Sequence, residues 1–173
     1  MTNEQKKFTH FKIHTQYSIC EGAIKIQDLA KYCKENKIKS IGLSDSFNLC
    51  GALEFSEEIS KVGTQPIIGS QINFKFHESM GKLAIFAMSE NGFKNLTKLS
   101  SKSYLEVKEN TIPHCLLDEL LKNSDDLIVL SGGTDSLFSN IIKKNNINQL
   151  EEIVKILKQK FQDRFYFEIQ RHG

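Results

Sequence analysis

The feature that most constrains the fold of this 173-residue chain is an alternation of short apolar segments with amphipathic stretches. Between the apolar segments, Ile26, Leu29, Ala30 and Cys33 fall at helical spacing, on one face of a helix. Strands that alternate with helices indicate right-handed βαβ units and a mostly parallel sheet. We therefore predict an α/β fold, either an open sheet or most of a barrel. Its predicted strands cover residues 8–14, 39–43, 66–74, 82–87, 127–130 and 165–169.

Helices are also predicted between the later strands. One covers residues 52–61, and a second begins at Ser89, a plausible N-cap, and buries Phe93, Leu96 and Leu99. Residues 108–114 are predicted to form a polar loop. Asn148, with Glu151 three residues later, resembles a capping box. The helix after it has the clearest apolar stripe of the chain, formed by Leu150, Ile153, Val154, Leu157 and Phe161.

Composition limits the class of protein. Hydrophobic residues make up 39% and charged residues 25%, which is typical of a globular domain. The net charge of +2 does not indicate a strongly basic nucleic-acid-binding face. No apolar run approaches the ~20 residues that span a bilayer, and the polar N-terminus has no signal-peptide core. We therefore predict a cytoplasmic protein without a membrane partner, in which the four scattered cysteines are free thiols.

Polar residues gather at the predicted strand ends, where α/β sheets and barrels carry their functional side chains. Imidazoles and carboxylates that converge from several strands would suit a metal-dependent phosphoesterase, whose metal ions activate water and neutralise phosphate. The alternative is that strand ends are polar in any barrel, with alternate residues sharing a face by pleating alone. His77 and His114 are interpreted as surface residues, and five phenylalanines, Phe8, Phe11, Phe74, Phe76 and Phe86, as core. The candidate site residues are His10, Lys12, His14, Glu21, Asp45, Ser46, Gln71, Glu168 and His172.

Several segments resemble a known family. The run from His14 to Gly22 (HTQYSICEG) resembles the first motif of the PHP (polymerase and histidinol phosphatase) domain. Further segments resemble the PHP domain at the N-terminus of bacterial DNA polymerase III alpha subunits. They occur in the order of that family and cover residues 45–51, 66–71, 92–100 and 163–170.

The resemblance implies a distorted seven-stranded β/α (TIM-like) barrel. Residues 1–173 would form a PHP domain that is incomplete at its C-terminal end, without the palm, thumb and fingers of the polymerase. The parent chain would be a DNA-directed DNA polymerase, a nucleotidyltransferase with Mg²⁺ in its palm, and this fragment alone would be catalytically inactive. The implied partners are the proofreading exonuclease (epsilon) subunit, the other holoenzyme subunits, and DNA through the parent chain.

Departures from the family motif indicate a degenerate metal site. Lys12, Ser46 and Gln71 stand where the motif has two histidines and a glutamate, and a lysine ammonium has no lone pair for a metal. His14 matches a ligand, and Glu21 replaces an acidic residue of similar role. Our hypothesis is that Lys12 sits where a metal would, its charge balanced by Glu21 or Asp45. No metal is then expected, and the remaining residues form a vestigial site, namely His10, His14, Glu21, Asp45, Glu168 and His172.

Two functions from different classes stay open at this point. The first is a structural and partner-binding module in DNA replication. The second is a metal-dependent phosphoesterase or 3′–5′ proofreading exonuclease, which would need Zn²⁺ or Mn²⁺ on an intact site, with His14 and Glu21 as its first ligands. A stand-alone enzyme similar to histidinol phosphatase is disfavoured by the polymerase-like segments. Metal content separates the two main alternatives.

Overall fold

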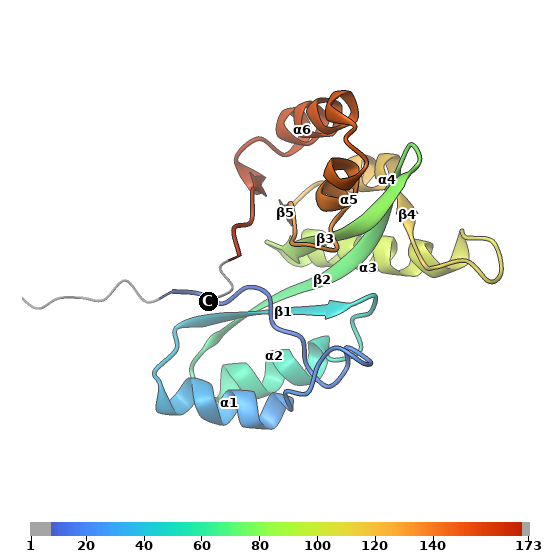
Figure 1. Ribbon diagram of the computed structural model, residues 1–173. Helices are drawn as coiled ribbons and strands as arrows, with labels where there is room; N and C mark the ends of the chain where they lie inside the picture. The colour runs from blue at the N-terminus through green and yellow to red at the C-terminus, as the bar shows by residue number, and fades with distance from the viewer. Residues whose placement is uncertain (1–7, 171–173) are drawn as a thin grey trace, which may run out of the picture.

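A single mixed sheet organises the structure, a computed structural model that describes residues 8–170 (Figure 1). Five of its strands lie in the order β1-β2-β3-β5-β6, and β4 pairs with β2 away from this path. The prediction of an α/β fold is confirmed. The six strands of the described residues are β1 (Ser40–Ser46), β2 (Gln65–Phe76), β3 (Ser79–Ala87), β4 (Cys115–Leu116), β5 (Leu127–Leu130) and β6 (Phe165–Tyr166).

Helices cover the sheet in two groups. Figure 1 shows α1 and α2 beneath β1, with α5 and α6 at the opposite end of the molecule and the long β2 reaching toward both groups. No helix within residues 8–170 is long and apolar enough to cross a membrane. The helices are α1 (Ile26–Glu35), α2 (Ala52–Lys61), α3 (Glu90–Leu105), α4 (Leu117–Lys122), α5 (Leu137–Lys143) and α6 (Ile147–Phe161), with a 3₁₀ turn at Gln162–Arg164.

Each helix group buries its own apolar core. The predicted face of α1 is confirmed, because all four of its apolar residues are buried against α2 and β1. The larger core joins β2, β3 and β5 to α3–α6, and it includes Phe74, Leu83 and Leu96. On α6, Ile153, Leu157 and Phe161 are fully buried, and Leu150 and Val154 pack against the same core. The stripe predicted for this helix is thus confirmed.

The sheet is mixed, so the prediction of a mostly parallel sheet fails at β3. β1 pairs with β2, β2 with β4 and β5 with β6 in parallel, but β3 runs antiparallel to both β2 and β5. The reason is the connection between β2 and β3, which consists of His77 and Glu78 alone. A two-residue loop can join only antiparallel strands, because a parallel pair needs a crossover of a dozen or more residues. His77 has the positive φ of 50° that such a tight turn requires.

The two ends of the described chain are less regular than predicted. Residues 8–14 form no strand, although this extended segment accepts hydrogen bonds from β1, from Gly42 N to His10 O at 2.7 Å and from Ser44 N to Ile13 O at 2.9 Å. The predicted strand 165–169 shortens to β6, and Ile169 beyond it is 87% exposed. The described residues therefore contain six strands of the seven that the family resemblance implied.

Several local predictions also need correction. Phe93 is exposed at the start of α3, although Ser89 does cap that helix by accepting a hydrogen bond from Gly92 N. The N-cap of α6 is Asn146, whose side chain accepts from Gln149 N, so the capping box at Asn148 is wrong. Phe8 is exposed rather than in the core. Both α4 and α5 are shorter than two full helical turns, so their apolar residues do not repeat often enough to predict a helix from the sequence.

Candidate functional site

Asp45, at the end of β1, anchors the loop that carries the first motif. Its carboxylate accepts hydrogen bonds from the backbone of Thr15 at 2.6 Å, from the hydroxyl of Thr15 at 2.7 Å and from Ser18 Oγ at 2.7 Å. Asp45 is only 1% exposed to solvent. Because both of its oxygens are engaged within the fold, Asp45 holds the loop after the N-terminal segment against β1.

His14 lies beside this anchor with both ring nitrogens engaged. Nδ1 is 3.2 Å from Ser18 Oγ, and Nε2 is 3.0 Å from the side-chain amide nitrogen of Gln71. Since Ser18 donates its own proton to Asp45, the network favours Nδ1–H as donor and Nε2 as acceptor. Burial lowers the pKa of His14 below 6.5, although the nearby Glu21 opposes the shift. The imidazole is therefore held neutral, with its lone pair directed at an amide.

Glu21 is held by a lysine from β3. Its carboxylate accepts a hydrogen bond from Lys82 Nζ at 2.6 Å and another from Ser46 Oγ, and it lies 3.7 Å from His14 Nδ1. Burial alone would raise the pKa of Glu21, but the hydrogen bonds from Lys82 and Ser46 outweigh burial and lower it. Lys82 also contacts Asp135 at 3.1 Å. One ammonium group thus lies between two carboxylates from distant loops.

Lys12 pairs with Glu168, so the hypothesis that Glu21 or Asp45 balances its charge is wrong. The distance from Lys12 Nζ to Glu168 Oε1 is 3.0 Å, and both side chains are largely buried. Glu21 is already paired with Lys82, and Asp45 is saturated by the loop, so neither offers Lys12 an acceptor. The second oxygen of Glu168 is buried without a hydrogen-bond partner among the described residues.

The structure unites part of the predicted site. His14 is hydrogen-bonded to Gln71, and Ser46 donates to Glu21. Ser18 Oγ links these two pairs to Asp45, because it contacts His14 Nδ1, accepts from Ser46 N and donates to Asp45. Lys12 and Glu168 form a separate pair. His10 lies outside the group, exposed and with its ring against Phe8. His172 falls outside the described residues.

Lys82 and Asp135 belong to the site but were missed from sequence. Lys82 is the only charged residue in β3. Because β3 is antiparallel, its start lies beside the end of β2, where Ala84 is opposite Gln71 and Lys82 opposite Asn73. A rule that searches only the C-terminal ends of strands overlooks such a residue. The isolated charge within an apolar strand was the available signal.

These residues do not fit a metal centre. Within residues 8–170, no three His, Cys, Asp or Glu side chains are grouped so that they could hold a metal ion. The lone pair of His14 is directed at Gln71, and the carboxylate of Glu21 is paired with an ammonium. A lysine ammonium only donates hydrogen bonds, so it competes with a metal for the same oxygens.

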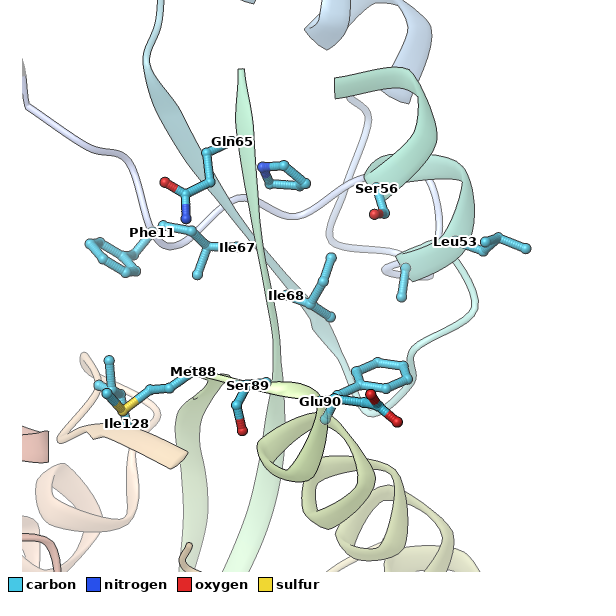
Figure 2. A pocket seen from close by; sticks show the side chains of 14 residues that line it. Phe11, Leu53, Ser56, Gln65, Ile67, Ile68, Met88, Ser89, Glu90 and Ile128 are labelled. Carbon is cyan, nitrogen blue, oxygen red and sulfur yellow. The ribbon is translucent and has the colours of Figure 1, made fainter. Parts of the chain in front are cut away.

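A wide apolar groove lies away from this cluster (Figure 2). It has a volume of about 800 Å³, and Figure 2 shows Ile67 and Ile68 of β2 along it, with Leu53 of α2 and Met88 at its borders. None of the residues that hold Glu21, His14 or Asp45 lines it. The polar cluster and the groove are therefore separate features of the molecule.

The chain belongs to the PHP domain family, whose family model matches residues 10–172. Similar curated proteins include DNA polymerase III alpha subunits. It is 32% identical over 174 residues to that of Haemophilus influenzae, with 99% of this chain and 15% of the relative covered. With that of Caulobacter vibrioides it shares 35% identity over 178 residues, which cover 98% of this chain and 16% of the relative. The resemblance found in the sequence motifs is confirmed.

A solved structure supports the fold assignment. A protein from Bifidobacterium adolescentis that is assigned as a metal-dependent phosphoesterase superposes with a TM-score of 0.54, covering 95% of this chain and 88% of that one. At 11% identity, this similarity shows the fold alone. The chain spans about one sixth of the length of its curated relatives.

Proposed function

We propose that this chain forms the PHP domain at the N-terminal end of a DNA polymerase III alpha subunit and acts there as a structural and partner-binding module. The relatives that cover almost the whole chain support this assignment. The parent chain would be the DNA-directed DNA polymerase, with DNA and Mg²⁺ bound by its palm. The partners would be the proofreading exonuclease subunit and the other subunits of a cytoplasmic holoenzyme.

The proposal rests on the contacts of three positions, Lys12, Ser46 and Gln71, where the family motif has metal ligands. Lys12 forms an ion pair, Gln71 faces His14, and Ser46 donates to Glu21. A phosphoesterase of this fold would need free lone pairs at these positions to bind ions that activate water. Changes around a metal commonly cost about 10–100-fold in affinity or activity even outside the ligands themselves. Hydrolysis by this domain is therefore not part of the proposed function.

Measurements of metal content and of phosphoester hydrolysis test the proposal that this domain binds no metal and is catalytically inactive. The chain is purified without chelator and without added metal, and zinc, manganese and iron are measured by elemental analysis. Hydrolysis of bis(p-nitrophenyl) phosphate and of a 3′-labelled oligonucleotide is then measured with added Mn²⁺ or Zn²⁺. We expect background metal and background rates. Stoichiometric metal with hydrolysis that a His14→Ala variant loses would instead establish the phosphoesterase or exonuclease.

Partner binding needs its own test. The full polymerase chain and a variant without residues 1–173 are each mixed with the exonuclease subunit, and complex formation is measured by analytical ultracentrifugation. We expect the complex only with the full chain. Equal binding by both would refute a partner-binding role, provided that the shortened polymerase still extends a primed template.

A further inference from the structure

Three segments of the chain converge on one ammonium group. Lys82 comes from β3, Glu21 from the loop after the N-terminal segment, and Asp135 from the loop after β5. The carboxylate oxygens lie 2.6 Å and 3.1 Å from Nζ, and the Phe47 ring centroid lies 5.2 Å from it. The Lys82 side chain is only 15% exposed. An ammonium in this setting links loops that are far apart in the sequence.

The charges around Lys82 leave no excess of cations. Lys12 and Lys82 supply two positive charges, and Glu21, Asp135 and Glu168 supply three negative charges within the same two ion-paired groups. Burial would lower the pKa of Lys82, but its hydrogen bonds to Glu21 and Asp135 raise it instead, so the ammonium stays charged. Without it, Glu21 and Asp135 would lose the ammonium that forms an ion pair with each of them.

Phe47 restrains the same ammonium from a second direction. Its backbone has a positive φ of 63°, a conformation that is uncommon for a bulky residue. Hydrogen bonds fix it on both sides, from Phe47 N to Gln71 O at 2.8 Å and from the Tyr104 hydroxyl to Phe47 O at 2.9 Å. The ring is thereby held near Lys82, where its face attracts the positive charge.

We propose that Lys82 is a built-in cation that takes the structural place of a bound metal ion, tying the Glu21 and Asp135 loops together over β3. The hypothesis made from sequence gave a comparable role to Lys12, but within residues 8–170 Lys12 forms an ion pair with one carboxylate, that of Glu168, whereas Lys82 bridges two. A chain without the Lys82 ammonium would hold two carboxylates, those of Glu21 and Asp135, without the group that joins them. That pair would take up a small exogenous cation. This inference rests on the ion pairs and does not depend on the polymerase context.

The test is cation rescue of a Lys82→Ala variant. We expect its thermal midpoint to lie below that of the unchanged chain, and Mn²⁺ to restore at least half of the loss. By calorimetry, one Mn²⁺ per chain should bind Lys82→Ala about tenfold or more tightly than the unchanged chain, a ratio within the range of changes made around metals. Adding Glu21→Gln to Lys82→Ala should abolish the rescue. Lys61→Ala is the matched control, because Lys61 is exposed and pairs with Glu58 alone.

Each outcome decides the inference. If Lys82→Ala does not fold, refolding from urea with and without Mn²⁺ replaces the thermal scan, and recovery only with Mn²⁺ supports the inference. An unchanged midpoint, a loss that Mn²⁺ does not restore, or equal rescue of Lys61→Ala would overturn it. If the rescue of Lys82→Ala fails while the unchanged chain contains only background metal, the inference is wrong and the proposed function stands. Stoichiometric metal in the unchanged chain would overturn the proposed function instead.

Discussion

Removal of the Asp45 carboxylate is expected to release the first-motif loop and destabilise the whole domain. In Asp45→Ala, the Thr15 amide and the hydroxyls of Thr15 and Ser18 lose their common acceptor. A buried donor left without a partner costs about 1–3 kcal/mol. The hydroxyls can rotate toward other acceptors, so we assign them about 2 kcal/mol together and the rigid amide the rest. The expected loss is then about 3–5 kcal/mol in the free energy of unfolding.

That loss is a large share of the total, because domains are stable by only about 5–15 kcal/mol. Urea denaturation followed by circular dichroism measures it, and hydrogen exchange shows whether amides 15–22 lose protection before the core. Asp45→Asn keeps an acceptor for the Thr15 amide and should lose about 1–2 kcal/mol. The exposed Asp163→Ala serves as control and should change stability by less than about 0.5 kcal/mol. A loss below about 1 kcal/mol for Asp45→Ala would refute the anchoring role.

Three further predictions follow from other contacts. The pKa of His14 is lower in the folded chain than its ordinary 6.5, so the unfolded chain binds more protons near and below pH 6.5. The free energy of unfolding should therefore fall as the pH drops through this window, and it should fall less in His14→Gln. In Gly42→Ala the new Cβ would lie 2.4 Å from Phe11 O, so urea denaturation should show a loss of about 1–3 kcal/mol; an unchanged midpoint would contradict the packing of residues 8–14 on β1. Hydrogen bonds from Lys102 and Lys122 hold the pKa of Glu119 at about 2, and an NMR titration of Lys102→Met should show it rising toward 4.5, whereas a constant value would contradict the ion pair.

The sequence was most informative where one physical signal acted alone. Helix α2 and strand β5 have the predicted bounds because each is a local periodic or apolar run between breaks. The direction of β3 depended on the two-residue connection at His77, which carries neither glycine nor the usual turn residues. The shortened β6 depended on pairing: only Phe165 and Tyr166 find partners, opposite Val129 and Leu130. Strand propensity could not reveal that limit.

The sequence predicted several residues of the candidate site but not which side chains pair with one another. Motif comparison found His14, Glu21 and Gln71, because their spacing follows the family pattern. The partner of each charge was decided by tertiary geometry, in which an antiparallel strand delivers Lys82 to the end of β2. Once Lys82 holds Glu21, Lys12 is left to Glu168. The antiparallel direction of β3 therefore places Lys82, rather than Lys12, between Glu21 and Asp135.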